Sequence, residues 1–247
     1  MELERGAAPD IHRVEDASVN WYLVEAEHGL TIVDAGVPSS WDSLQRVLGE
    51  IGREASEVRA LVLTHAHFDH IGFAERARSE LGIPVYLHEN DVTLARKPLQ
   101  YTHERARSRY LLTKPKGLPH VLGFLASRAF WPRPLQGATT FAAERLDVPG
   151  NPQILFTPGH TLGHCALYFP DRDAVIAGDA IVMLDPYTGA RGPRIVAGAA
   201  TADSGRALSS LDALAAVEAG TVLTGHGEPW RGGTAEAVRQ ARAAGAS

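Results

Sequence analysis

The stretch from Thr64 to Gly72, with the sequence THAHFDHIG, constrains this chain more than any other segment. It places three imidazoles and one carboxylate between His65 and His70, directly after an apolar segment at 60–63 that predicts a buried strand. Histidines two residues apart on an extended segment point to the same side, and a helix that begins near Asp69 would turn its first residues back towards them. Because imidazole and carboxylate are ligands of zinc and iron, this stretch predicts a metal site. A polar loop between a strand and a helix would not need three of the chain's 11 histidines.

Composition narrows the classes of protein that remain. The 247 residues are enough to bury a sizeable core, and 45% hydrophobic and 21% charged residues are typical of a soluble globular protein. A net charge of −5 argues against a general nucleic-acid binder. The single cysteine, Cys165, leaves no disulfide framework and no thiolate zinc site. With no secretory signal pattern at the N-terminus and no apolar run near the ~18 residues of a membrane span, we expect a cytoplasmic protein without a transmembrane segment.

The order of the predicted elements indicates an α/β layered fold. A β-hairpin at 19–33 precedes a helix that starts at Ser39 or Ser40 and ends at Gly52, and a second helix ends at Gly82. Beyond residue 145 we expect a Gly/Pro-rich loop at 185–200 and a helix of about 15 residues that starts near Thr201 or Asp203. The other predicted strands are 60–63, 84–88, 153–156, 165–169, 174–177 and 221–224.

Residues 91–140 interrupt this rhythm. Between Val92 and Thr140, nine lysines and arginines stand against one acid, Glu104, which gives the segment a net charge of +8. Aromatic residues alternate with these charges, and Pro115, Pro119, Pro132 and Pro134 predict two short helices joined by loops. Such a segment fits a lid, a homodimer contact or a membrane-surface contact, and equally a solvated helical excursion. We interpret the chain as one domain, 1–247, with a basic, aromatic, helical insert at 91–140.

Four further metal-ligand candidates share one placement. Asp34, His160, Asp179 and His226 each follow a predicted strand and lie beside or near a glycine. Ligands in open α/β sheets gather beyond the carboxyl ends of the strands, and glycine leaves room for the chain to turn there. We therefore expect these side chains to converge on the 65–70 cluster.

Together these motifs resemble the metallo-β-lactamase superfamily over nearly all of the chain except the insert. The matching segments are His65-Ala66-His67-Phe68-Asp69-His70, Thr157-Pro158-Gly159-His160-Thr161, Gly178-Asp179 and Thr224-Gly225-His226-Gly227. The resemblance implies a four-layer αββα sandwich with two metal ions at one edge between its sheets. It also implies the ligands: His65, His67 and His160 for the first zinc, Asp69, His70 and His226 for the second, and Asp179 between both.

The resemblance further implies a hydrolase of the glyoxalase II-like or lactonase-like branch. Two zinc ions would share a water molecule and lower its pKa from about 15.7 to about 7, which makes hydroxide available to attack an ester, thioester or lactone. Asp69 would also orient this nucleophile or carry a proton. Asp34 and His164 are expected behind the ligands, as hydrogen-bond partners that orient them or, for His164, as a core residue. Cys165 and the remaining histidines are expected to be packing or surface residues.

The substrate is expected to be a small molecule, anionic or acyl-bearing. Tyr101, Tyr110, Trp131 and Tyr187 are candidate substrate-binding residues, and the insert would cover the metals as a lid.

Two other functions are consistent with the fold. An iron-dependent dioxygenase of the persulfide type could use the same ligands, although diiron relatives usually have Glu at the position of His67. A phosphodiesterase or nuclease would need a wider basic surface, so no nucleic-acid partner is expected.

Overall fold

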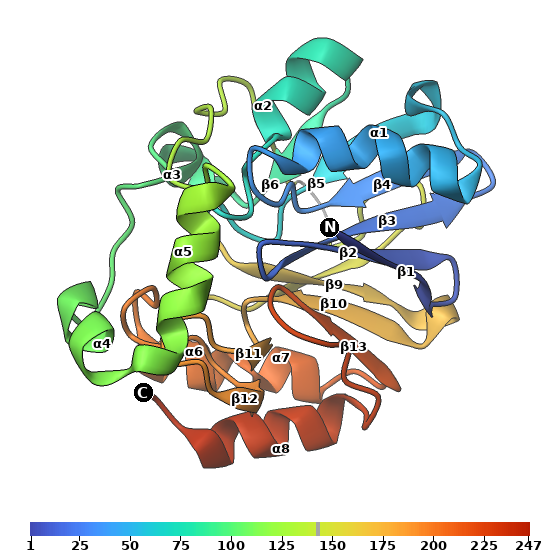
Figure 1. Cartoon of the computed structure of the whole chain (residues 1–247). Helices are drawn as coiled ribbons and strands as arrows, with labels where there is room; N and C mark the ends of the chain where they lie inside the picture. Colours follow the sequence, from blue (N-terminus) through green and yellow to red (C-terminus); the bar gives the residue numbers. More distant parts are fainter. Residues whose placement is uncertain (142–143) are drawn as a thin grey trace.

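The computed structural model describes residues 1–141 and 144–247, apart from the side chains of Leu111, Leu112 and Val121. Two β-sheets face each other, and helices cover the outer face of each (Figure 1). The first sheet has seven strands in the order in which they occur along the chain. They are β1 (Glu2–Ala8), β2 (Ile11–Asp16), β3 (Val19–Ala26), β4 (Gly29–Val33), β5 (Val58–Val62), β6 (Val85–Leu87) and β7 (Thr139–Thr140).

Strand direction changes within this sheet. Strands β1 to β4 are antiparallel, and β4 to β7 are parallel, so the carboxyl ends of β4, β5 and β6 meet at one edge. The predicted hairpin at 19–33 corresponds to β3 and β4. Strands β1 and β2 were not predicted, because β1 is an edge strand with mostly exposed polar residues and owes its conformation to backbone pairing with β2.

The second sheet has four strands in the order β13-β10-β9-β8, and β10 and β13 are parallel. A separate two-stranded sheet joins β11, at 182–184, to a strand within the segment that was expected to be an irregular loop at 185–200. There β12 pairs with β11, although Gly192 and Pro193 give β12 no strand signal of their own. The strands are β8 (Gln153–Phe156), β9 (Cys165–Phe169), β10 (Ala174–Gly178), β11 (Val182–Leu184), β12 (Arg191–Arg194) and β13 (Thr221–Thr224).

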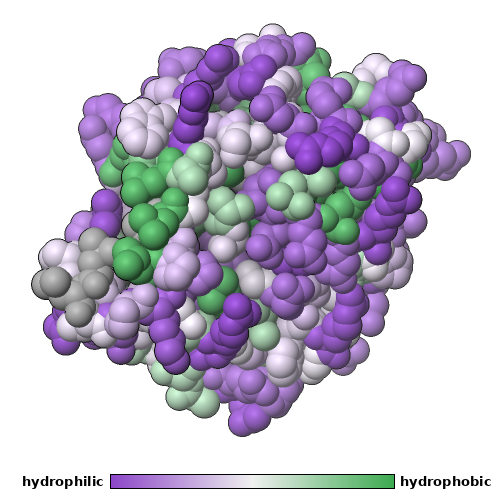
Figure 2. Space-filling model, viewed as in Figure 1, coloured by the Kyte–Doolittle hydropathy of each residue, from purple (hydrophilic) through white to green (hydrophobic). Residues whose placement is uncertain are grey.

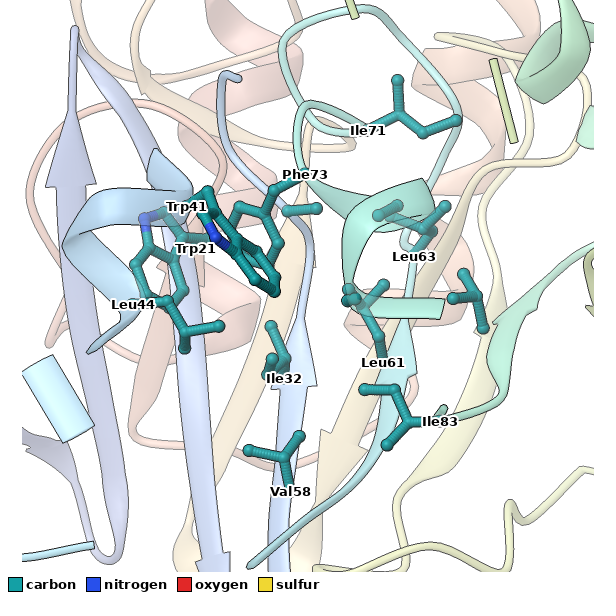
Figure 3. Packing of buried hydrophobic residues seen from close by; sticks show 14 of the residues in the cluster. Trp21, Ile32, Trp41, Leu44, Val58, Leu61, Leu63, Ile71, Phe73 and Ile83 are labelled. Carbon is teal, nitrogen blue, oxygen red and sulfur yellow. The ribbon is translucent and has the colours of Figure 1, made fainter. Parts of the chain in front are cut away.

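Two helices cover the first sheet. These are α1 (Ser40–Ile51) and α2 (Ala74–Arg76), which continues as a π-helical turn to Leu81 and ends at Gly82. Trp21 of β3 packs edge-on against Phe73, with ring centroids 5.4 Å apart, and Leu44 of α1 lies in the same cluster (Figure 3). This aromatic and aliphatic layer anchors the start of α2, and with it the histidine stretch that precedes α2.

Three helices cover the second sheet: α6 (Ser204–Ser210), α7 (Asp212–Ala215) and α8 (Thr234–Ala244). A single helix was predicted where α6 and α7 lie. The helix is interrupted at Leu211, which is fully buried in the same core cluster as Leu214. Asp203 caps the start of α6 by accepting a hydrogen bond from the backbone N–H of Arg206.

The space between the sheets is filled from both sides. Tyr22 and Val24 of β3 point inward, whereas Trp21 and Leu23 point to the helical layer, as the alternation of a strand requires. Ile176 of β10 faces Tyr22 and Val24 within the same cluster. Helix, sheet, sheet and helix therefore form four layers, which confirms the expected αββα sandwich.

The insert contains three α-helices instead of the two predicted: α3 (Val92–Arg96), α4 (Arg107–Thr113) and α5 (Leu118–Ala126). Glu104 of the insert accepts hydrogen bonds from the backbone N–H (2.8 Å) and the hydroxyl (2.6 Å) of Ser204, so the insert is fixed to the start of α6. Hydrophobic residues gather on the exposed side of α5 (Figure 2), where Leu122 and Leu125 are 55% and 48% exposed. Among the described residues, no helix has the length and apolar character needed to cross a membrane.

Candidate metal centre

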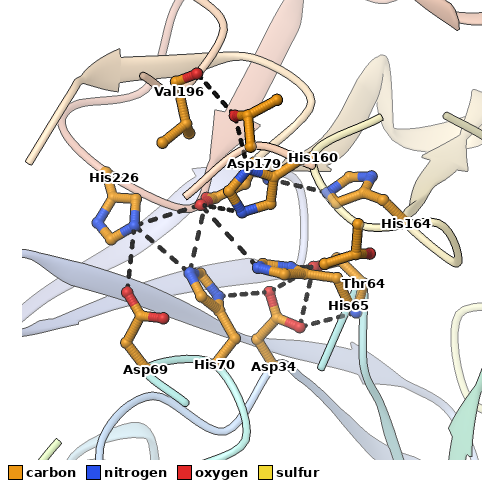
Figure 4. Close-up of polar contacts among 12 residues, drawn as sticks. Asp34, Thr64, His65, Asp69, His70, His160, His164, Asp179, Val196 and His226 are labelled. Carbon is orange, nitrogen blue, oxygen red and sulfur yellow. Dashed lines mark hydrogen bonds and ion pairs between the residues drawn. The ribbon is translucent and has the colours of Figure 1, made fainter. Parts of the chain in front are cut away.

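The histidine stretch follows β5 at the edge where the parallel strands end. The backbone N–H groups of His70 and Ile71 both donate to the carbonyl of His67, each at 3.0 Å, so the chain turns back immediately after His67. The carbonyl of His70 accepts from the N–H of Ala35 at 2.7 Å, beside the end of β4. This turn directs the side chains of His65, Asp69 and His70 towards Asp179 and His226, which follow strands of the second sheet (Figure 4).

One cluster consists of three imidazoles. The Nε2 atoms of His65, His67 and His160 lie within 4.8 Å of one another, and all three residues are buried. Within the part of the chain that the structure describes, none of these nitrogens forms a hydrogen bond. Buried polar atoms are almost always partnered, so three converging bare nitrogens fit a metal ion of the kind that imidazole binds.

A second cluster lies beside it and joins Asp69, His70 and His226. The Nε2 atom of His226 is 3.6 Å from Oδ2 of Asp69 and 3.5 Å from Nε2 of His70. Asp179 lies between the clusters, with Oδ2 3.2 Å from Nε2 of His160 and 3.4 Å from Nε2 of His226. The structure therefore brings together all seven residues that the sequence motifs singled out.

The two clusters differ in charge. Burial lowers the pKa of His65 and of His67 well below the ordinary histidine value, so both rings stay neutral and keep the lone pair that a metal binds. Burial also acts to lower the pKa of His70, but the carboxylates of Asp179 and Asp34 outweigh it and raise this pKa to about 10. His65 and His67 of the first cluster can therefore bind a metal cation directly. In the second cluster His70 is protonated, so a metal cation must displace its proton.

Asp34 holds two of the ligand rings. Its carboxylate lies 3.1 Å from Nδ1 of His70 and accepts the hydroxyl of Thr64 at 2.9 Å, while Thr64 in turn accepts from Nδ1 of His65 at 3.0 Å. Both histidines therefore present Nε2 to the clusters. Asp34 is fully buried and has a φ of 58°, a left-handed conformation that is strained for a residue with a side chain and occurs at functional sites.

His164 lies behind Asp179. Its Nε2 accepts the backbone N–H of Asp179 at 3.0 Å, and its Nδ1 lies 2.8 Å from the hydroxyl of Thr157. Burial lowers the pKa of His164 to about 3, which keeps the ring neutral and able to accept. His164 therefore positions Asp179 and does not face the clusters.

The rings of His226 and His160 are oriented by oxygen atoms that the sequence gave no reason to select. Nδ1 of His226 donates to the carbonyl of Ser18 at 2.7 Å. Nδ1 of His160 lies 3.3 Å from the hydroxyl of Thr201, which donates to the carbonyl of Val196 at 2.7 Å. A backbone carbonyl carries no residue signature, so these contacts could not be read from the sequence.

Asp91 is a residue that the sequence analysis missed. Its carboxylate accepts the N–H of Ala66 at 3.0 Å, the hydroxyl of Thr161 at 2.7 Å and the N–H of Gly163 at 2.8 Å. It therefore ties the histidine stretch to the loop that carries His160. Asp34 directly follows β4, whereas Asp91 lies four residues beyond β6, so the rule of an acid after a strand would have selected Glu89 before Asp91.

Asn20, at the start of β3, joins the two sheets beside the clusters. Its backbone N–H donates to Gly225 at 2.8 Å, and its side-chain amide donates to the carbonyls of Thr224 and Gly227 at 2.8 and 2.7 Å. Arg13 fixes the amide by donating to its oxygen at 3.0 Å. The loop that carries His226 is thus held by protein hydrogen bonds.

Glycine is required at position 225 by the closeness of the ligands. A Cβ atom there would lie 2.0 Å from Oδ1 of Asp179 and 2.8 Å from Cε1 of His70. Neither atom belongs to a side chain that can move without disturbing the clusters.

The candidate substrate residues are divided by the structure. The ring of Tyr101 lies 4.3 Å from that of His67, and its hydroxyl is 3.1 Å from the hydroxyl of Tyr187. Tyr110 lines the same cavity as these two tyrosines. Trp131 does not join them: it is 66% exposed and lines a separate surface cavity beside Arg76. On the other side of Tyr101, a cleft of about 250 Å³ reaches His67 and His160.

The other predicted packing and surface residues lie away from the clusters. His12 lies 2.6 Å from Glu25, and His88 stacks on Phe156. Cys165 is buried in β9, where burial raises its pKa to above the ordinary thiol range.

Comparison with known proteins was made against families, curated sequences and solved structures. The family model of the metallo-beta-lactamase superfamily matches residues 14–226. The probable metallo-hydrolase YflN of Bacillus subtilis is 28% identical over 92% of this chain and 87% of its own. The metallo-beta-lactamase family protein TTHA1429 of Thermus thermophilus has a TM-score of 0.68 at 24% identity, over 94% of this chain and 78% of its own. TTHA1623, solved in a di-iron-bound form, has a TM-score of 0.62 at 27% identity, over 89% and 92%.

Proposed function

Because the chain belongs to the metallo-beta-lactamase superfamily, we propose that it is a hydrolase that uses two zinc ions to cleave an ester, thioester or lactone bond of a small molecule. The observation that carries this proposal is the pair of adjoining buried clusters with Asp179 between them, together with the Nε2 atoms of the first cluster, which form no hydrogen bond among the described residues. A metal-dependent hydrolase is also the description given to YflN.

We assign His65, His67 and His160 to one ion and Asp69, His70 and His226 to the other, with Asp179 as the shared ligand. Two carboxylates and five neutral imidazoles leave two divalent ions with a net charge of about +2. Such a site favours an anionic substrate, or a neutral one that becomes negatively charged as it reacts. The assignment agrees with the grouping of the ligand atoms and with the lone pairs that the pKa values of His65 and His67 preserve.

Zinc ions bound in these clusters would supply Lewis acidity and make a water molecule acidic enough to act as a nucleophile at neutral pH. The chain's own residues would then orient the substrate and handle the proton. Asp69 is 6% exposed and its Oδ2 lies 3.6 Å from Nε2 of His226, and the described residues offer its carboxylate no hydrogen bond. We assign to Asp69 the transfer of a proton from the nucleophile to the leaving group. Tyr101 would cover the cleft from the insert and exclude water above His67.

We propose that the insert at 91–140 belongs to the same domain as the metal centre. Its contacts through Glu104 and Asp91 reach α6 and both ligand loops, which supports a lid fixed over the cleft. The exposed leucines of α5 also fit the expected homodimer contact, which the mass in solution would test. A protein that remains monomeric at high concentration would exclude it.

Iron is the alternative metal, because the similar protein TTHA1623 was solved with two iron ions. An iron-dependent dioxygenase would be the matching alternative activity. Metal analysis of protein purified without added metal separates the two. We expect about two zinc ions per chain together with turnover of a lactone, thioester or simple ester in a panel that also contains a phosphodiester and a cephalosporin. One iron per chain with substrate-dependent oxygen uptake would refute the hydrolase proposal.

A further inference from the structure

A second cavity lies on the far side of Tyr101 from the cleft. It measures about 160 Å³ and is bounded by α4, α5 and the loop that carries Tyr187. Its lining is mostly aromatic or aliphatic. The lining residues are Tyr101, Arg107, Tyr110, Lys114, Gly117, Leu118, Phe124, Phe130 and Tyr187. A concave, apolar site with a few polar groups is the usual form of a small-molecule site.

This cavity adjoins the candidate metal centre, and two aromatic side chains form part of the wall between them. The ring of Tyr101 lies 4.3 Å from that of His67, and the ring of Phe124 lies 6.5 Å from that of His226. One residue of each proposed metal set therefore lies beside this wall. A molecule whose reacting carbonyl lies at the metals can place its apolar part in the cavity when the Tyr101–Tyr187 pair, whose hydroxyls are 3.1 Å apart, separates.

Two cations are the only charged residues among those that line the cavity. Arg107 lies over the ring of Tyr101 at 4.3 Å, and Lys114 is exposed at the end of α4. Within residues 1–141 and 144–247, neither cation forms an ion pair with an acidic side chain. A cation that is unpaired at the mouth of an apolar cavity complements an anionic group on the ligand.

The cavity is large enough for a ligand group. Its volume of about 160 Å³ is well above the roughly 10–15 Å³ that one water molecule requires. The cavity therefore has room for a short apolar chain whose far end lies beside Arg107.

We propose that this cavity binds the acyl part of the substrate and that Arg107 and Lys114 bind a carboxylate at the far end of that part. The substrate class is then an ester, thioester or lactone whose short acyl chain ends in an anion. This inference rests on the proposed hydrolase function, and it adds which part of the substrate lies in the insert and what charge that part carries.

Binding of three product-like acids to the metal-loaded protein as purified tests the proposal by calorimetry. Acetate reaches only the metals, hexanoate adds the chain, and adipate adds the second carboxylate. We expect adipate to bind about fivefold more tightly than hexanoate at low salt, since an exposed ion pair contributes up to about that factor. Arg107→Gln should remove this difference. Arg109→Gln, a change of the same kind on α4 at a residue that does not line the cavity, should preserve it.

A second pair of variants tests the chain part of the site. Leu118→Trp fills the cavity and should weaken hexanoate and adipate while acetate binds unchanged. Leu122→Trp on the same helix points to solvent and should weaken none of them. Equal binding of adipate and hexanoate by the unaltered protein, or an unchanged preference in Arg107→Gln, would overturn the proposal.

The same samples separate this proposal from the hydrolase function. Tight adipate binding that depends on Arg107, without turnover of any ester, thioester or lactone, would refute the function and leave the cavity assignment in place. Turnover without any preference for chain length or terminal charge would refute the cavity assignment alone.

Discussion

Replacing Asp91 by alanine would leave three buried donors without an acceptor: the N–H groups of Ala66 and Gly163 and the hydroxyl of Thr161. Each unsatisfied buried donor costs about 1–3 kcal/mol, so the three together cost about 3–9 kcal/mol. Part of this cost is offset, because a buried carboxylate, whose pKa burial raises, is removed. We therefore expect the free energy of unfolding to fall by about 3–5 kcal/mol.

Urea unfolding in the presence of a chelator measures this loss without a contribution from metal binding. Thr161→Val removes one of the three hydrogen bonds and should cost about 1 kcal/mol. Asp212→Ala serves as the control, because Asp212 is an exposed acid whose loss should change stability by less than about 0.5 kcal/mol. In competition with a chelator, Asp91→Ala should bind metal about 10–100-fold more weakly, since both ligand loops lose their tie. An Asp91→Ala protein within about 1 kcal/mol of the unaltered chain, with unchanged metal affinity, would refute this reasoning.

Three further predictions follow from the clusters themselves. Asp179→Ala should lower metal content and hydrolytic turnover together, whereas His28→Ala, a change at an exposed histidine in the turn between β3 and β4, should change neither; metal analysis of both proteins decides this. Gly225→Ala should cost metal affinity at near-normal secondary structure, because its Cβ would lie 2.0 Å from Asp179, and normal affinity would show that the loop can yield. The pKa of His164 is about 3 in the folded chain and about 6.5 when unfolded, so the unfolded chain takes up a proton first as the pH falls. The free energy of unfolding of the metal-free protein should therefore fall by about 1.4 kcal/mol per pH unit from pH 6.5 towards pH 3. His164→Gln should flatten this dependence in urea unfolding measured from pH 7 to pH 4, and an identical slope would contradict it.

The ligand positions could be predicted because their chemistry and their placement agree. Asp34, His160 and Asp179 are residue types with metal or hydrogen-bonding chemistry, and each follows an apolar strand that periodicity identifies. The parallel strands carry their carboxyl ends to one edge, so the convergence of these residues follows from topology. The αββα layering is a consequence of the same alternation of strands and helices.

The remaining features depend on contacts that leave no trace in residue type. Ser18 orients His226 through its carbonyl, and any residue could supply that atom. Strands β1 and β12 form through backbone pairing with a neighbour and not through their own side-chain pattern. Tyr101, Tyr110 and Trp131 of the insert were candidates for the cleft. The side of an irregular segment that faces the protein is set by the contacts that attach the segment to the core. Glu104 and Tyr110 fix one part of the insert, and Trp131 lies beyond it on the outside.

The clamp formed by Asn20 has a consequence for how the protein acquires its metal. Hydrogen bonds from β3 hold the loop of residues 224–227, so the two sheets are joined at this edge by contacts that involve no proposed metal-ligand side chain. We therefore expect the chain to stay folded when a chelator removes its metal, so that one metal can be exchanged for another. The metal recovered with the protein should then follow the relative supply of zinc and iron in the medium during growth. Expression in media of defined metal ratio, followed by exchange of the purified protein against the other metal, would make that supply visible in one experiment.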